Sequence, residues 1–244
     1  MALLKQTEVL EHDIRTMGRA LGTRVHYITH ELATITHIWD VHEVVFGTRD
    51  GVELSNVIGN FSATIQMVLY EHVVVGLCRL TDRSKGTNKV GTLPRLVKEE
   101  LRESCHKLVK DAENAARELK SLRDNRLAHS NLDYLQHSDQ IDRPARIAVT
   151  DTISKIHQVI DFLSREYQSS TLGWTPLGNE AGAEFIQELI RAREFRELED
   201  ARIAGGGRPR RLWPSWLSEA TELDRYNRSR IDDVLEDQFE EQRR

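Results

Sequence analysis

Residues 122–130, Leu-Arg-Asp-Asn-Arg-Leu-Ala-His-Ser, bring together guanidinium groups, a carboxylate, an amide and an imidazole. An imidazole has a reference pKa of about 6.5, so His129 can accept or donate a proton near neutral pH. Arginine is always charged and its planar fork matches a phosphate, so Arg123 and Arg126 can stabilise negative charge. These side chains are suited to acid–base chemistry on a phosphate ester.

RNA is a phosphate ester that such a site can cleave without a metal, because the 2′-hydroxyl is a nucleophile beside the scissile phosphate. The site must remove the hydroxyl proton, stabilise charge on the phosphate and protonate the leaving oxygen. One His129 and one Arg123 per chain are few for three tasks. If two copies pair about a twofold axis, one imidazole accepts a proton while the other donates. A homodimer of this kind could cut RNA with no metal or other cofactor.

A long helix is needed to position these residues. Upstream of them, apolar residues recur at alternating steps of four and three, as on a helix face packed against other helices. They are Leu101, Cys105, Leu108, Ala112, Ala115, Leu119 and Leu122. Continued without a break, this spacing reaches Arg126 and His129, while Arg123 lies about 120° round the helix from His129. Arg123 must therefore reach across, or belong to a site assembled from two chains.

The same residues carry a family resemblance. Arg123, the polar Asp124, four more positions and then His129 resemble the motif of the HEPN superfamily (higher eukaryotes and prokaryotes nucleotide-binding domains). The tail Arg-Leu-Ala-His-Ser resembles the abortive-infection-type branch of that superfamily. The resemblance covers residues from about 50 to 168 and implies an all-helical domain whose motif closes a long helix.

The resemblance also implies a function. It suggests a metal-independent endoribonuclease of a toxin or phage-defence system, with Arg123 and His129 as catalytic residues. An antitoxin or other regulatory partner is the further partner it implies. The polar residues between the catalytic pair would orient the substrate or contact its phosphate: Asp124, Asn125 and Arg126.

The chain departs from one related pattern. In HEPN toxins neutralised by a nucleotidyltransferase partner, a tyrosine two residues after the histidine is the modified group. Here that position is Asn131, and the nearest tyrosine is Tyr134. The departure argues against control by nucleotidylation there and leaves the identity of any antitoxin open.

Two other interpretations stay open. Cations near a helix C-terminus are favoured by the exposed carbonyl groups, so Arg126 and His129 can be simple dipole partners at a helix end. The chain would then be a HEPN-like module that binds RNA, nucleotides or a protein without cutting. A third interpretation is a helical interaction protein whose acidic C-terminal arm recruits a partner.

Composition limits the class of protein. The 244 residues are 39% hydrophobic and 30% charged, which is enough for one sizeable core with an appendage. A formal net charge of −5 excludes a generally basic protein, so contact with RNA must come from a local patch. Cys78 and Cys105 fall on apolar helix faces and are expected to be buried free thiols, as in a reducing cytosol. The longest apolar run, 73–78, is far shorter than the about 20 residues of a membrane span, which predicts a cytoplasmic protein with no membrane contact.

Periodicity predicts an all-α fold, a bundle of four to five helices over residues 1–168. One helix is expected over 2–46, bent near Gly18 and Gly22, and a second over 52–82. The run 71–76 has strand propensity, but the helical period continues on both sides of it. Arg79, Asp82 and Arg83 near its end are equally well explained as a solvated helix end.

Cap signals suggest where the next helices begin. Thr92 is the expected N-cap of a new helix with proline in its first turn. Whether residues 93–103 form a separate helix or the first turns of the motif helix stays open. A loop is expected over 130–144, followed by a helix capped at Thr150 and Asp151.

Residues 169–244 are predicted to form a charged helical extension. A linker leads to a helix over about 180–203, and a last acidic helix is expected over 216–241. Between them lies a basic hinge that could grip single-stranded nucleic acid, although docking of the arm onto its own domain or a second subunit is favoured. Its key residues are Arg208, Arg210, Arg211, Trp213 and Trp216.

Three histidines share one helix face with Ala33: His26, His30 and His37. Their steps could suit a zinc ion, but no cysteine or acid completes a known ligand spacing. We expect solvated or packed histidines.

Overall fold

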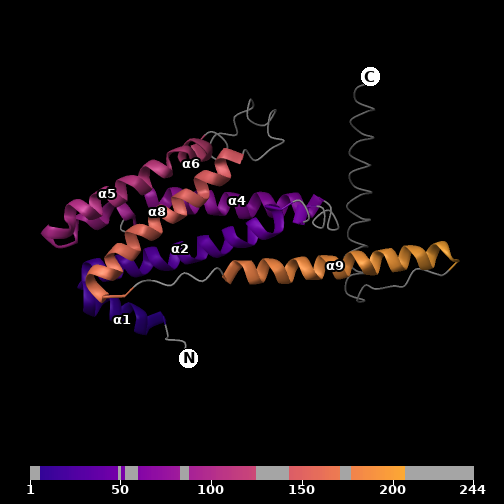
Figure 1. The fold of residues 1–244 in the computed structure, drawn as a ribbon, viewed down its shortest axis with the longest axis horizontal. Coiled ribbons are helices and arrows are strands. Elements are labelled where there is room, and N and C mark those ends of the chain that lie inside the picture. The colour runs from indigo at the N-terminus through magenta and orange to yellow at the C-terminus, as the bar shows by residue number, and fades with distance from the viewer. Residues whose placement is uncertain are drawn as a thin grey trace, which may run out of the picture. The chain divides into compact units, whose positions relative to one another are not determined.

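The part of the chain that the structure describes is helical. In the computed structural model, the described residues are 6–48, 51–52, 60–82, 88–124, 143–170 and 177–206, and none of them lies in a strand. The elements are α1 (Gln6–Met17), α2 (Arg19–Phe46), α4 (Asn60–Thr81), the 3-10 helix η2 (Val90–Arg95), α5 (Glu99–Ala115), α6 (Arg117–Leu122), α8 (Arg143–Gln168) and α9 (Leu177–Ala204) (Figure 1). The predicted all-α fold is confirmed.

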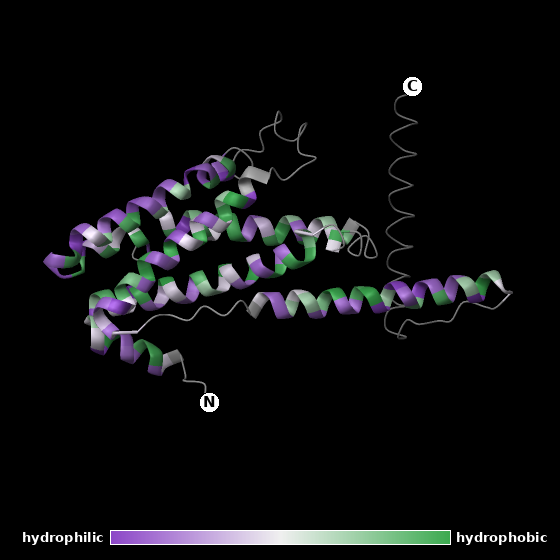
Figure 2. Cartoon of the chain, viewed as in Figure 1, coloured by the Kyte–Doolittle hydropathy of each residue, from purple (hydrophilic) through white to green (hydrophobic). Residues whose placement is uncertain are grey.

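One hydrophobic core is shared by α2, α4, α5 and α8, with α1 packed on α2 and η2 packed on α5. Each of the four contributes fully buried side chains, among them Ile28, Leu77, Cys105 and Ile156. Hydrophobic and hydrophilic residues alternate along these helices, as amphipathic helices of a bundle require (Figure 2). Each buried Leu or Ile contributes about 1.5–3 kcal/mol to the free energy of folding.

Two glycines shape the N-terminal helix pair. Gly18 separates α1 from α2 with φ 79° and ψ 157°, a backbone conformation that residues with side chains rarely adopt. Gly22, in the first turn of α2, lies against α1, where a Cβ would come 2.3 Å from the Asp13 carbonyl O. The predicted bend is confirmed, and the chain turns at Gly18 itself.

The segment before α5 is a 3-10 helix. Thr92 lies inside η2 and its Oγ1 donates to the Lys89 carbonyl O at 2.7 Å. Pro94 is also inside η2 and lacks the N–H that a longer α-helix would need. The predicted N-cap at Thr92 was therefore wrong, because its hydroxyl bonds backwards along the chain. Residues 93–103 divide between η2 and the first turn of α5.

The motif helix is interrupted at Ala116, so the prediction of an unbroken helix was wrong. Ala116 has φ −74° and ψ −4°, which departs from helical ψ, and α6 starts after it. Its methyl group is fully buried, so the irregularity accompanies core packing and not a helix-breaking residue type. The buried row keeps its four-three spacing across the break: Cys105, Val109, Ala112, Ala116 and Leu119. Residues 108 and 115 of the predicted row are only partly buried.

α8 begins at Arg143, well before the predicted cap at Thr150 and Asp151. Pro144 lies in its first turn, where a missing N–H costs nothing and the fixed φ favours a helix. Thr150 lies inside α8, and its Oγ1 accepts a hydrogen bond from Trp39 Nε1 at 3.1 Å. The predicted cap was wrong, because this hydroxyl joins α8 to α2.

α4 is helical throughout 71–76, as predicted. Val73 and Val74 are fully buried there, and burial overrides the preference of β-branched residues for strands. The stretch Phe61–Thr81 is long and apolar enough to cross a membrane by length and composition alone, a test that the buried core helix of a soluble protein also passes.

The chain divides into two compact units, residues 1–193 and 194–244. α9 begins in the first unit and confirms the helix expected over about 180–203. In the second unit it is followed by Gly206, whose φ of 88° is the left-handed conformation that often closes helices. The predicted basic hinge with its arginines and tryptophans, and the helix over 216–241, lie outside the described residues.

Candidate functional site

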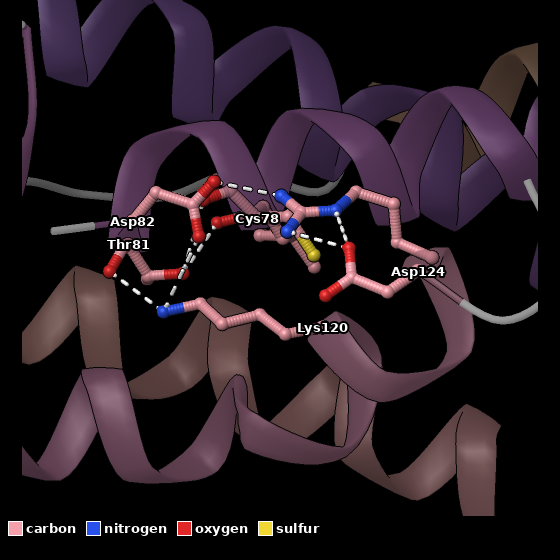
Figure 3. A network of polar contacts seen from close by, with 7 residues as sticks. Cys78, Thr81, Asp82, Lys120 and Asp124 are labelled. Atoms are coloured by element: carbon pink, nitrogen blue, oxygen red, sulfur yellow. Dashed lines mark hydrogen bonds and ion pairs between the residues drawn. The ribbon is translucent and has the colours of Figure 1, made fainter. Parts of the chain in front are cut away.

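Arg123 and Asp82 form an ion pair that joins the end of α6 to the end of α4 (Figure 3). Arg123 Nη1 donates to Asp82 Oδ2 at 2.7 Å, and Arg123 Nε donates to Asp124 Oδ1 at 2.9 Å. Lys120, one turn earlier in α6, donates from Nζ to the Thr81 carbonyl O at 2.8 Å. The same Nζ lies 3.6 Å from Asp82 Oδ1. These five residues are called the Arg123 cluster below.

The end of α4 explains why cations gather there. Asp82 directly follows α4, where the last carbonyl groups carry partial negative charge and disfavour an acid. Lys120 offsets this by donating to one of those carbonyls, and Arg123 by pairing with the carboxylate. Since both side chains of the Arg123–Asp82 pair are about a quarter exposed, we expect the pair to contribute only about 0.2–1 kcal/mol to stability.

The guanidinium of Arg123 has two carboxylate partners with different exposure. Its hydrogen bonds to Asp124 and Asp82 raise its pKa further above the ordinary value, so it stays charged. The Asp124 side chain is 57% exposed, against 25% for Asp82. Arginine has five N–H donors, and its bonds to these two carboxylates leave donors on the Nη groups for another acceptor. Asp82 thus holds Arg123 against another helix, whereas Asp124 is its more exposed partner.

Cys78 lies next to the cluster, one turn before Asp82 (Figure 3). It is fully buried, and burial raises the pKa of its thiol to about 11, although Arg123 opposes the shift. The thiol is therefore protonated near neutral pH and is not a nucleophile. Burial likewise raises the pKa of Cys105 to about 11. Both cysteines are free and buried, which confirms the prediction for them.

Arg123 continues the buried row of α5 and α6, four positions after Leu119. It therefore faces the end of α4, which the predicted row ending at Leu122 did not indicate. Arg123 and Asp124 have a π-helical backbone, a geometry found frequently at functional sites. The other motif residues lie outside the described residues, so their placement stays a prediction: Asn125, Arg126, His129, Asn131 and Tyr134.

Three members of the cluster, Thr81, Asp82 and Lys120, were not predicted as site residues from the sequence. Asp82 was grouped with Arg79 and Arg83 as a solvated helix end, and Lys120 was assigned no role. An acid directly after an apolar helix was the available signal, because it requires a cation from elsewhere. Arg79 donates from Nε to Glu31 Oε1 of α2 at 2.7 Å, and Arg83 lies outside the described residues.

The three histidines of α2 do not converge. His26 is buried, and its Nδ1 lies 3.2 Å from Asp13 Oδ2 of α1. His30 and His37 are exposed. Within the described ranges, no group of three or more His, Cys, Asp or Glu residues is placed to hold a metal ion.

Comparison with known protein families identifies a match that spans most of the chain. The family model HEPN AbiU2 matches residues 19–187, which is more than half of the chain. The matched span begins at α2, includes the Arg123 cluster and ends within α9. No curated protein and no solved structure matches the chain.

Proposed function

This chain belongs to the AbiU2 family of HEPN domains, and on that premise we propose that it is a metal-independent endoribonuclease of a toxin or phage-defence system, active as a homodimer. The observation that carries the proposal is the arrangement of Arg123, a permanently charged and partly exposed group that pairs with a less exposed carboxylate, Asp82, and a more exposed one, Asp124. Such a group can bind a phosphate that bears developing charge.

Arg123 has the role of phosphate ligand. An RNA phosphate takes the place of Asp124 on the exposed edge of the guanidinium, while Asp82 keeps the other edge in position. Because the guanidinium is already oriented, little reorganisation is needed as charge builds on the phosphate. Asn125 and Arg126 orient the RNA or add contacts to the same phosphate.

His129 has the role of acid and base. One imidazole removes the proton from the 2′-hydroxyl, whose oxygen forms a bond to phosphorus while the bond to the 5′-oxygen breaks. The imidazole of the second copy protonates that 5′-oxygen. The products therefore end in a 2′,3′-cyclic phosphate and a 5′-hydroxyl, and neither step needs a metal or other cofactor.

The setting of the activity follows from the same proposal. The protein works in the cytoplasm, where RNA is present and where free thiols such as Cys78 and Cys105 are kept reduced. An antitoxin or regulatory partner restrains it, since uncontrolled cleavage of RNA would be toxic.

A second candidate function is a HEPN module that binds RNA, a nucleotide or a protein without cutting. The observation that favours it is that both carboxylates already engage Arg123. An arginine so occupied can serve to join α4 to α6 and need not meet a substrate.

Cleavage by the full-length protein tests the proposal. Purified protein is incubated with end-labelled single-stranded RNA in the presence of a chelator, and the products are tested for cyclic phosphate ends. We expect Arg123→Ala and His129→Ala to lower the rate by roughly 10²–10⁴-fold, as loss of charge stabilisation or proton transfer should. The matched controls are Arg165→Ala, an exposed arginine of α8, and His30→Ala, an exposed histidine of α2.

The outcomes separate the two candidates. Cutting by His129→Ala at the wild-type rate contradicts the nuclease proposal. Binding of RNA by the wild-type protein without any cutting supports the second candidate. Thermal unfolding followed by circular dichroism shows whether each variant is folded.

A further inference from the structure

A cavity of about 360 Å³ lies between η2 and α5, away from the Arg123 cluster along the helix. Its apolar part is formed by Pro94 and Val109, both of which are buried. Arg95 of η2 and Lys110 of α5 bring two basic side chains to it, and both are exposed. Its size is within the range of ligand sites, and we call it the η2–α5 cavity.

The charges of the η2–α5 cavity favour an anion. Neither Arg95 nor Lys110 has an ion-pair partner among the residues that the structure describes. The imidazole of His106 also lines the cavity and can donate a hydrogen bond to an anion. Glu113 is the single acidic residue of the lining. The lining thus carries two cations and one acid, on a chain whose formal net charge is −5.

The lining residues of α5 lie in line with the Arg123 cluster. His106, Lys110 and Glu113 each follow by one position a residue of the buried row. Arg117 and Lys120 follow Ala116 and Leu119 in the same way, so all five lie on one side of that row. This side of α5 and α6 extends from the cavity to Arg123. At a rise of 1.5 Å per residue, Lys110 and Arg123 are about 20 Å apart along the helices.

Arg117 lies between the η2–α5 cavity and the Arg123 cluster. It is exposed, and its Nη2 donates to the neutral Asn114 Oδ1 at 2.9 Å. A cation with a neutral partner keeps its charge available to a phosphate. The side of α5 and α6 therefore offers cations at the cavity and at Arg117, and it leads to the Arg123 cluster, where Lys120 and Arg123 pair with carboxylates. A row of cations is the pattern by which proteins follow a single-stranded backbone.

We propose that the η2–α5 cavity is a second RNA-binding site, which holds a backbone phosphate and its nucleoside several nucleotides away from the scissile bond. This inference rests on the proposed function. Arg95 and Lys110 bind the phosphate, and the sugar lies against the small apolar floor that Pro94 and Val109 form in the cavity. The site strengthens binding of a long RNA and does not contribute to cleavage of a substrate too short to reach it.

Binding by charge-reversal variants tests the inference. Lys110→Glu and Arg95→Glu are compared with Lys107→Glu, which changes the net charge equally on an exposed residue of α5 that does not line the cavity. Affinity for a labelled single-stranded RNA that spans both sites is measured by fluorescence anisotropy over a range of salt concentrations. We expect Lys110→Glu and Arg95→Glu each to weaken binding about tenfold and to reduce the slope of log affinity against log salt concentration by about 0.7 for each phosphate that is no longer neutralised. Lys107→Glu should bind nearly as the wild type does.

Cleavage of a dinucleotide separates this inference from the proposed function. The cavity variants should cut the dinucleotide at the wild-type rate, whereas Arg123→Ala should fail on both substrates. If the wild-type protein binds RNA but cuts none, the nuclease proposal fails, and the binding comparison still shows whether the cavity binds RNA. Equal weakening by Lys110→Glu and Lys107→Glu, or no weakening by either, overturns the inference, as does absence of RNA binding by the wild-type protein.

Discussion

Arg123 shares its charge between Asp82, which closes α4, and Asp124, which is its neighbour in the chain. The first contact restrains the guanidinium relative to another helix, and the second does not. Asp82 is thus a positioning residue for Arg123. Its own substitution should affect the chemistry more than the stability, because the pair is partly exposed and weak as a stabilising contact.

We predict that Asp82→Asn lowers the rate of RNA cleavage roughly tenfold, which corresponds to about 1.4 kcal/mol of transition-state stabilisation. The amide keeps the shape of the side chain but loses the charge that holds Arg123. The effect should appear in kcat more than in KM, because Arg123 acts on charge that develops during the reaction. Asp161→Asn, on α8, is the matched control, since its carboxylate pairs with Arg165 at similar exposure. Unchanged kcat in Asp82→Asn would show that Arg123 needs no anchor.

Among the helix contacts, the contact between α2 and α8 contains a histidine kept neutral by the fold. His157 Nε2 lies 3.3 Å from Thr36 Oγ1. Burial lowers the pKa of His157 to about 4, although the charge of Asp161 opposes the shift. In the unfolded chain His157 has its ordinary pKa of about 6.5. Between about pH 6.5 and 4, the unfolded state is therefore protonated at His157 while the folded state is not. The contribution of neutral His157 to the free energy of unfolding is fully present above about pH 6.5, and it is lost as the pH falls from 6.5 towards 4.

We predict that His157→Gln makes stability less dependent on pH. Wild-type protein should lose about 1–3 kcal/mol of unfolding free energy at this residue between neutral pH and about pH 4, because of the proton bound on unfolding. The variant lacks a titrating group there, so its urea midpoint should fall less over the same pH range. His30→Gln, on the exposed side of α2, should keep the wild-type pH dependence. If the urea midpoint changed with pH equally in His157→Gln and in the wild type, His157 would be solvated in the folded protein.

The proposed activity of the whole molecule requires two copies, because one His129 and one Arg123 do not suffice for two proton transfers and charge stabilisation. Its acidic composition argues against general attraction to RNA, so we expect a local cationic surface, such as the side of α5 and α6 proposed above, to make the contact. A site shared by two chains needs His129 from both of them. A chain that lacks His129 should inactivate an intact chain when the two pair.

We predict that His129→Ala protein lowers the cleavage activity of wild-type protein with which it pairs. A mixed dimer retains only one His129 imidazole, so it cannot accept one proton and donate another. Activity of a fixed concentration of wild-type protein is measured after exchange of subunits with excess His129→Ala protein, and dimer formation is followed by analytical ultracentrifugation. Excess His30→Ala protein, which keeps His129, is the control. Undiminished activity, although mixed dimers with His129→Ala form, would contradict a shared site.

Helix identity was predictable because burial along a helix is periodic and local. The apolar period was enough to predict α4 across a run of β-branched residues, and the turn at Gly18 followed from residue type. Helix ends were less predictable. Thr92 and Thr150 have the side chain of a cap, but one hydroxyl bonds to Lys89 and the other to Trp39, partners that no local rule reveals.

By itself, the sequence determined that the chain is an all-α domain of the HEPN type, because helical periodicity and the family resemblance both depend on residues that are close in the chain. Only the tertiary structure decided that Arg123 meets Asp82 and that Lys120 closes α4. The α4 end and the α6 residues are distant in the chain, and they meet only because α4 and α6 pack against each other. Which charges face one another is therefore set by packing of the core and not by local spacing.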